Sequence, residues 1–302
     1  MTRLENNNQN KKLLLIVNPV SGKKTIMNCL PDVIKVYQDA GYVCTVMVTE
    51  KPGDARLFAQ TYAALQDEVV CAGGDGTLNE TISGLASANI PVPIGYIPCG
   101  TTNVFAESHG IPLDVIAAAR ASVEGTCHFY DLGKIEDNYF AFVAAFGAFS
   151  WLSYTTNQCL KNTLGKTAYF IEGIKDIKAV RSFRMKIAAD GVSYEDDFLF
   201  GAVTNTASVG GIFELPKDTV NANDGVFELL LIHRPNSLKD FNVIIRSLLQ
   251  QDYSSPYIEL THCKDIVIEN PDAAEFSIDG EKYVTPQTVN ITMIRDFFKI
   301  IS

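Results

Sequence analysis

Residues 71–80 decide the fold, because they join an apolar strand to a helix through three glycines and read CAGGDGTLNE. Gly73, Gly74 and Gly76 allow the backbone to adopt positive φ and to approach a ligand closely. The N–H groups that begin the following helix have no partner within the helix, and they attract an anion. The segment therefore predicts a cradle for the phosphates of a nucleotide.

Asp75 stands inside this glycine loop and would repel a polyphosphate. A divalent cation between the two resolves the repulsion, so the loop predicts Mg²⁺ as a companion of the nucleotide. The structural alternative is an ordinary Gly-Asp-Gly turn, with Thr77 and Glu80 forming a capping box. Other glycine motifs do not fit, because there is no GxxxxGK[ST] and Asn79 replaces the third glycine of a dinucleotide fingerprint.

Length and composition bound the class of protein. The 302 residues are enough for two domains, and a net charge of −10 argues against a nucleic-acid partner. The longest apolar stretch, residues 139–152, is too short to span a bilayer, so no transmembrane segment is expected. Residues 1–10 are polar and Asn-rich, which predicts a disordered tail. Seven cysteines without a CxxC spacing indicate reduced thiols in a cytoplasmic protein.

Strands and helices alternate from residue 11 to about residue 130, which predicts a doubly wound parallel sheet. Ligands bind outside the carboxyl ends of the strands in such sheets. Four loops meet at that edge, and they read NPVSGK at 18–23, TEK at 49–51, the glycine loop, and PCGTTN at 98–103. Each loop alone could be a turn, but four together predict a site.

From residue 130 onward the pattern changes to closely spaced strands, which predicts a β-rich second domain. Hairpin signals are present at Asp190-Gly191, Asp224-Gly225 and Asp279-Gly280. Helical inserts are expected near residues 166–180 and 238–249. With no low-complexity linker in the chain, the cleft between the domains is the expected site.

Four motifs, taken together and in order, resemble the diacylglycerol kinase catalytic family in its soluble bacterial branch: NPVSG at 18–22, GGDGTLNE at 73–80, GTTN at 100–103 and SIDGE at 277–281. The resemblance implies an α/β fold with a doubly wound nucleotide-binding domain, similar to NAD kinase and phosphofructokinase, at 11–130 and completed by 290–302. It implies a β-sandwich lipid kinase domain at 131–289.

The same resemblance implies an activity. The chain would transfer the γ-phosphate of ATP to the hydroxyl of diacylglycerol, giving phosphatidic acid, while bound peripherally at the cytoplasmic face of a membrane. A homodimer is left open.

The resemblance also assigns site residues. Its nucleotide contacts fall on Asn18, Pro19, Val20, Ser21, Gly22, Thr49, Gly74, Asp75, Gly76, Thr77, Leu78, Asn79, Glu80 and Thr101. Its catalytic base falls on Glu281, with Asp75 acting through the catalytic Mg²⁺. Its structural Mg²⁺ falls on Asn221, Asp224 and Val226, the first and last through backbone carbonyls.

Two departures from the family pattern keep alternatives open. Asn223 stands where the family has the first aspartate of Asp-Asp-Gly, which puts the structural Mg²⁺ in question. Val104 stands where the bacterial lipid kinases carry aspartate, which leaves the acceptor lipid open. The alternatives are a kinase of another hydroxyl-bearing lipid, an NAD kinase, and a catalytically silent nucleotide-binding regulator.

Two further points stay open. Asp279 either shapes the turn before Glu281 or acts as a second carboxylate. The apolar segments at 140–152 and 164–170 could line an acyl tunnel, but burial in a core is the favoured interpretation.

Overall fold

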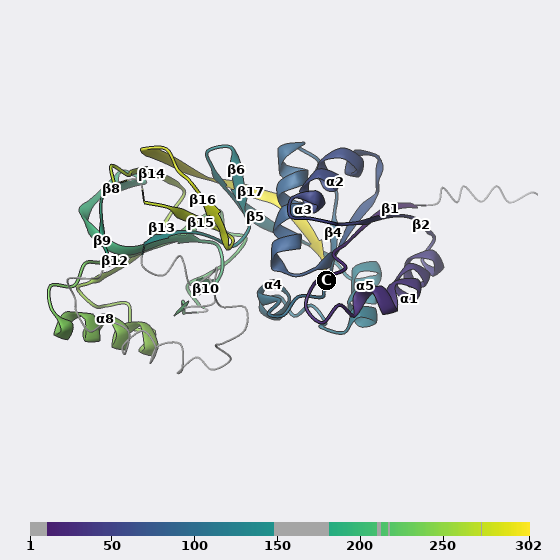
Figure 1. The fold of residues 1–302 in the computed structure, drawn as a ribbon, viewed down its shortest axis with the longest axis horizontal. Coiled ribbons are helices and arrows are strands. Elements are labelled where there is room, and N and C mark those ends of the chain that lie inside the picture. Colours follow the sequence, from purple (N-terminus) through teal and green to yellow (C-terminus); the bar gives the residue numbers. More distant parts are fainter. Residues whose placement is uncertain (1–10, 148–180, 210–212, 217, 273) are drawn as a thin grey trace, which may run out of the picture. The chain divides into compact units, whose positions relative to one another are not determined.

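The computed structural model describes residues 11–147, 181–209, 213–216, 218–272 and 274–302, which belong to two compact units (Figure 1). Unit 1 comprises Met1–Phe129 and Phe298–Ser302, and unit 2 comprises Tyr130–Phe297. The predicted domain boundary lies one residue away from this division. The last strand re-enters unit 1 at residue 298, later than the predicted residue 290.

Unit 1 is a parallel sheet with strand order β2-β1-β3-β4-β17. Its elements follow the predicted alternation: β1 (Lys11–Val17), α1 (Ile26–Asp39), β2 (Tyr42–Val48), α2 (Asp54–Tyr62), a 3₁₀ turn (Ala63–Leu65), β3 (Glu68–Gly73), α3 (Asp75–Ser87), β4 (Ile94–Pro98), α4 (Val104–Ser108) and α5 (Val115–Glu124). The end of β17 (Thr288–Ile301) supplies the fifth strand. The α/β fold class is therefore confirmed for this unit.

The helices of unit 1 cover the two faces of its sheet, because successive side chains of each strand point to opposite faces. Alternate residues of β1 (Leu13, Leu15 and Val17) pack with α1 and α5 on one face of the sheet. On the other side α2 and α3 lie against each other, and a Cβ added to Gly84 of α3 would be 2.3 Å from the Arg56 carbonyl oxygen of α2 (Figure 1). Both faces of the sheet are thus covered, which leaves the strand ends as the place for a site.

Unit 2 is built from antiparallel pairs that branch at one long strand, β9. The order β16-β15-β7-β9-β8-β14-β17 forms the main path, and β9 also pairs with β12, which pairs with β13. The strands are β5 (Cys127–Ile135), β6 (Asn138–Phe140), β7 (Val143–Gly147), β8 (Phe183–Ala189), β9 (Val192–Thr204), β10 (Ser208–Val209), β11 (Phe213–Glu214), β12 (Phe227–His233), β13 (Ile258–Cys263), β14 (Asp265–Glu269), β15 (Phe276–Ile278) and β16 (Glu281–Tyr283). Since these strands are hydrogen-bonded into one branching sheet, apart from the separate β10-β11 pair, the β-sandwich description is not confirmed.

Two apolar cores hold unit 2 together, one on each face of β12. Phe227, Leu229 and Leu231 belong to one core, whereas Leu230 and Ile232 belong to the other. The second core is covered by α8 (Leu238–Gln250), the helix predicted at 238–249. Phe140 and residues 143–146 are buried in these cores, which confirms the core interpretation for most of the segment 140–146. Residues 148–152 and 164–180 lie outside the described residues.

The hairpin signals have different outcomes. Asp190-Gly191 joins β8 to β9 and Asp279-Gly280 joins β15 to β16, and all four residues have positive φ, as a type I′ turn requires. The hairpin predicted at Asp224-Gly225 is wrong, because β12 after it pairs with β9 and β13. Gly225 does have positive φ, but it lies in the loop before β12, and positive φ is found in such loops as well as in hairpin turns.

Glu68, the first residue of β3, generates a prediction about pH. Its side chain is buried, and burial raises its pKa to about 7, although Tyr42 and Lys11 offset part of the rise. The pKa in the unfolded chain is about 4.3. Because folded Glu68 holds its proton more tightly than the unfolded chain does, protonation adds to the free energy of unfolding. This contribution is complete below about pH 4.3 and is lost as the pH rises through about 7.

We expect Glu68→Gln to flatten this dependence. With about 1.4 kcal/mol per pKa unit, the wild type should lose on the order of 3 kcal/mol relative to the variant between pH 4.5 and 8. Urea denaturation across this range measures the difference. Parallel stability curves for the two proteins would show that Glu68 does not titrate in this range.

Candidate nucleotide-binding and catalytic site

Helix α3 begins without a side-chain cap. Its N-cap residue is Gly74, with extended backbone angles and no side-chain hydrogen bond to the helix. The predicted capping box is wrong, because Thr77 Oγ1 instead accepts a hydrogen bond from Asn18 Nδ2 at 3.0 Å. Glu80 accepts hydrogen bonds from the backbone N–H groups of Gly53 and Ala55, so it caps α2. The first N–H groups of α3 are thereby left for an anion.

Glycines bring three of the predicted loops into backbone contact. A Cβ placed on Gly74 would lie 3.2 Å from the Cα of Gly100 and 3.5 Å from Ser21 Oγ. Gly22 has φ +49°, and a Cβ there would lie 2.3 Å from the Cys99 carbonyl oxygen. The loops after β1, β3 and β4 therefore meet around the start of α3, as the sequence predicted.

Asn18 organises the first of these loops. Its backbone N–H donates to the Ala72 carbonyl at the end of β3, and its Oδ1 accepts from the Val20 N–H at 3.1 Å. Together with its bond to Thr77, these contacts tie the NPVSG segment to the glycine loop. Val20 is 65% exposed, whereas Leu78 is fully buried and acts as core. Asn79 Oδ1 is buried without a hydrogen-bond partner among the described residues.

Carboxylates and amides shape the remaining loops at this edge. Thr49 follows β2 and donates its N–H to the Val17 carbonyl at 2.9 Å. Asp54 accepts from the N–H groups of Glu50 and Lys51, and these bonds lower its pKa. Asn103 closes the fourth loop by bonding both the N–H and the carbonyl of Gly100, which leaves Thr101 exposed. Asn103 belongs to the GTTN motif, but it was not among the predicted site residues.

Asp75 caps a helix. Its two carboxylate oxygens accept hydrogen bonds from the N–H groups of Val104, at 3.0 Å, and Phe105, at 3.1 Å, at the start of α4. Burial raises its pKa, and these two bonds offset part of the rise. Val104 contributes through its backbone, so its replacement of aspartate leaves this contact intact. The role of Asp75 toward Mg²⁺ stays a prediction.

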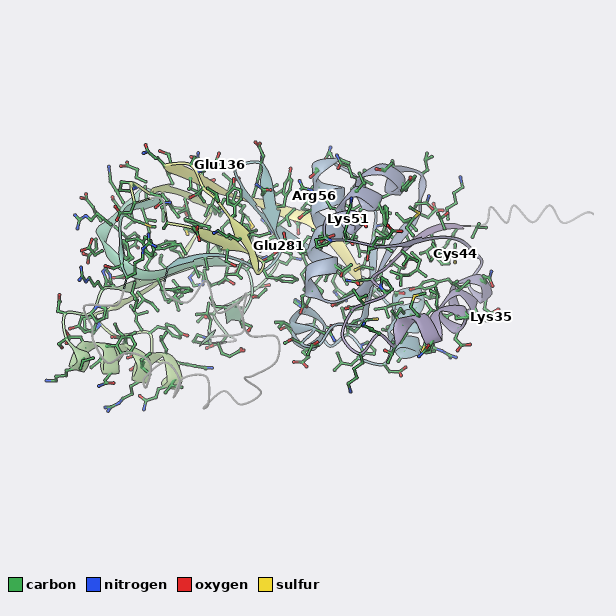
Figure 2. All side chains as sticks on the ribbon, in the orientation of Figure 1. Lys35, Cys44, Lys51, Arg56, Glu136 and Glu281 are labelled. Carbon is green, nitrogen blue, oxygen red and sulfur yellow. The ribbon has the colours of Figure 1, made fainter. Side chains whose placement is uncertain are left out.

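In unit 2, Glu281 is the exposed first residue of β16, directly after the Asp279-Gly280 turn (Figure 2). Asp279 Oδ2 accepts from the Ala141 N–H at 2.8 Å, and its Oδ1 accepts from the Phe142 and Val143 N–H groups at 3.1 and 2.7 Å. Its own N–H donates to the Val143 carbonyl. Asp279 therefore anchors the turn that presents Glu281.

The predicted metal residues lie in the loop before β12. Asn221 Oδ1 accepts from the Asn223 N–H, and Asp224 Oδ1 accepts from the Val226 N–H. The next residue, Gly225, donates to the buried carboxylate of Asp131, which the sequence analysis missed although it is a lone acid in an apolar strand. No group of three or more His, Cys, Asp or Glu side chains among the described residues is arranged to hold a metal. The assignment of Asn221, Asp224 and Val226 to a cation, with backbone carbonyls as ligands, stays a prediction.

A buried carboxylate follows this loop in the chain, and His262 Nε2 lies 3.8 Å from its Oε1. Glu228, two residues after Val226, is fully buried, and neither of its carboxylate oxygens has a hydrogen-bond partner in the described part of the chain. Buried carboxylates are otherwise paired or bound to metals. The residues present in this loop are therefore compatible with Mg²⁺, which takes oxygen ligands.

The capping role of Asp75 yields a prediction about stability. Asp75→Ala should lower the free energy of unfolding by about 1–2 kcal/mol, because the first N–H groups of α4 lose their acceptors. Asp75→Asn should lose less, since its amide oxygen still accepts one bond. Urea denaturation measures both, with Asp32→Asn on the exposed face of α1 as control. A stability of Asp75→Ala equal to that of the control would contradict the capping role.

Comparison with known proteins agrees with these motifs. Residues 12–135 match the family described as diacylglycerol kinase catalytic domain. A diacylglycerol kinase of Bacillus subtilis (strain 168) is 32% identical over 273 residues, which cover 90% of each chain. A diacylglycerol kinase of Staphylococcus carnosus (strain TM300) is 30% identical over 274 residues, covering 90% of this chain and 89% of the relative.

Solved structures extend the likeness to the whole fold. A crystal structure of a diacylglycerol kinase from Bacillus anthracis strain Sterne has a TM-score of 0.73 at 25% identity, covering 96% of both chains. A second structure from the same organism reaches 0.79 at 26% identity with the same coverage. Within the described residues, no helix is both long and apolar enough to cross a membrane. The chain belongs to the diacylglycerol kinase family.

Proposed function

We propose that the protein is an ATP-dependent lipid kinase that transfers the γ-phosphate of ATP to the hydroxyl of diacylglycerol, giving phosphatidic acid. The observation that carries the proposal is the uncapped start of α3, where three loops of unit 1 meet through glycine backbones. The free backbone N–H groups at the start of a helix can bind a phosphate directly, so no charged side chain is needed for this contact. Family membership and the names of the relatives support the lipid acceptor.

Each part of phosphoryl transfer has a candidate residue in this chain. The reaction needs a held nucleotide, neutralised phosphate charge and a positioned acceptor hydroxyl. The NPVSG loop and the first turn of α3 hold the nucleotide in this proposal. Mg²⁺, when bound with ATP, neutralises the charge that develops on the phosphates, and Asp75 is the residue of the loop that would hold it. A carboxylate has about four acceptor positions, so the two capping bonds leave room for a metal.

Glu281 is the proposed general base, which accepts the proton of the lipid hydroxyl. Its exposed position at the start of β16 leaves the carboxylate accessible to a substrate. Asp279 is the proposed positioning residue, because three backbone N–H groups engage its carboxylate in holding the turn. The open alternative of Asp279 as a second catalytic carboxylate is therefore disfavoured. The acceptor lies in a membrane, so the enzyme works at a membrane surface.

A phosphorylation assay with an acceptor panel tests the proposal. Radiolabelled ATP is supplied with diacylglycerol in mixed micelles, with other hydroxyl-bearing lipids, with NAD and without acceptor. We expect label in phosphatidic acid and no label in NADP. Faster labelling of another lipid would reassign the acceptor, whereas labelling of NAD would support the NAD kinase alternative. ATP binding without any transfer would support a silent regulator.

Glu281→Gln separates chemistry from binding. The amide keeps the size of the side chain but accepts no proton, so turnover should fall by on the order of 10² or more. The Kd for ATP, measured by calorimetry, should stay within about twofold, because the proposed nucleotide contacts lie in unit 1. Lys282→Gln, the exposed neighbouring residue on the same hairpin, is the control. Unchanged turnover in Glu281→Gln would exclude it as the base.

Asp279→Ala should lower kcat by on the order of 10-fold or more while the KM for ATP stays nearly constant, because the turn before Glu281 loses its anchor. Asp279→Asn should recover part of the activity, since its remaining oxygen still accepts from the Phe142 and Val143 N–H groups. Steady-state kinetics of the two variants measure the recovery. An equal loss of kcat in Asp279→Ala and Asp279→Asn would show that the negative charge of Asp279 is required, which would indicate a direct catalytic role.

A further inference from the structure

Strand β16, which carries Glu281, is a short edge strand. It has three residues and stands at the end of the strand order, so β15 is its one neighbour in the described part of the sheet. Ile278 pairs with Glu281 beside the turn, and Phe276 pairs with Tyr283 at the other end. A slip of one residue in this pairing would turn Glu281 to the opposite face. The direction of its side chain therefore depends on what fixes the two ends of β16.

The two ends of β16 are fixed in different ways. At the start, the carboxylate of Asp279 accepts hydrogen bonds from three backbone N–H groups. At the far end the ladder stops, and Ala274 and Thr285 each lie two residues beyond its last pair. In a longer antiparallel ladder these two residues would stand opposite each other. Another group has to join them here.

The side chain of Asn270 takes the place of the missing ladder. Its Oδ1 accepts from the Ala274 N–H at 2.8 Å, and its Nδ2 donates to the Ala274 carbonyl at 3.0 Å. The amide thus bonds both backbone groups of one residue, as a paired strand residue does. Nδ2 also donates to Thr285 Oγ1 at 3.0 Å, which in turn lies 3.3 Å from the Ala274 carbonyl oxygen. One side chain joins the segment before β15 to the segment after β16.

This anchor accepts one register of β16. Asn270 is fully buried, and its backbone N–H donates to the Gln287 carbonyl oxygen. Val284 and Pro286 flank Thr285, and neither side chain has a hydrogen-bonding group. A slip by one residue would therefore bring an apolar side chain to Nδ2 and leave a buried donor without an acceptor, which lowers stability.

We propose that Asn270 is a positioning residue for Glu281: by holding Thr285, it fixes the register of β16 and so the face to which the side chain of Glu281 points (Figure 2). The inference rests on the proposed function, in which Glu281 is the general base. Asp279 and Asn270 then hold the two ends of one strand, the first through the turn and the second through the hydroxyl of Thr285.

Steady-state kinetics and amide hydrogen exchange of full-length variants test the inference. Asn270→Ala should lower kcat by on the order of 10-fold, with the KM for ATP within about twofold of wild type. Exchange of the β16 N–H groups that bond β15 should be at least about 10-fold faster. Thr285→Val, which loses the acceptor, should change both quantities in the same direction but less. Thr285→Ser keeps the hydroxyl and should match the wild type.

A double-mutant cycle separates positioning from a general loss of stability. In the Glu281→Gln background, Asn270→Ala should lower kcat by less than about twofold, because the group that it positions is already lost. Ser237→Ala is the control, since it removes the cap of α8, where Ser237 Oγ accepts from the Asp240 N–H at 3.2 Å. It should lower stability and keep kcat. Equal fold losses for Asn270→Ala in both backgrounds would overturn the proposal, as would an equal loss of kcat in the control.

Hydrogen exchange tests the anchor without any activity. Wild-type exchange of β16 in both Asn270→Ala and Thr285→Val would overturn the anchor even if Glu281 is the base. Unchanged turnover in Glu281→Gln would instead overturn the proposed base, and with it the catalytic consequence of the anchor, while faster exchange in Asn270→Ala would still support the fixed register.

Discussion

The contact between the backbones of Gly74 and Gly100 is the constraint on which unit 1 depends. With 3.2 Å between a Cβ on one glycine and the Cα of the other, no side chain fits at Gly74 without moving the neighbouring loop. The contact lets the loops after β3 and β4 close over the end of the sheet. It also explains why the start of α3 has no side-chain cap, because backbone from adjoining loops occupies the space around Gly74. Backbone packing thus leaves the first N–H groups of α3 without a side-chain cap from Gly74.

Several acidic side chains among the described residues accept hydrogen bonds from backbone N–H groups of distant segments. Asp75 holds the start of α4, Glu80 holds the start of α2, and Asp279 holds residues 141–143. Asp131 receives the N–H groups of Gly225 and Asp296 in the same way. Charge-assisted bonds of this kind are stronger than neutral ones and fix loop geometry. Loss of activity on replacing such a residue therefore does not by itself identify a catalytic group, and stability must be measured beside it.

The sequence predicted elements wherever a periodic pattern or a local turn rule decides the outcome. The alternation of unit 1, α8 and the turns at Asp190-Gly191 and Asp279-Gly280 follow from such local rules. The prediction for Glu80 failed, and Asp131 was overlooked, because the hydrogen-bond partners of these side chains lie far away along the chain. Glu80 bonds residues 25 and 27 positions away, so its spacing from Thr77 suggested a capping box that does not form. Asp131 was missed because its partners are 94 and 165 positions away.

The two buried glutamates show why similar burial leads to different expectations. Glu68 lies at the amino end of β3, where burial raises its pKa and a side-chain hydrogen bond with Tyr42 and the charge of Lys11 offset part of the rise. Glu228 has Asp224 nearby, whose charge acts in the same direction as burial. At Glu68 burial favours the protonated acid, whereas Tyr42 and Lys11 favour the carboxylate. At Glu228 burial and the charge of Asp224 both favour the protonated acid, so its two causes act together where those at Glu68 oppose one another.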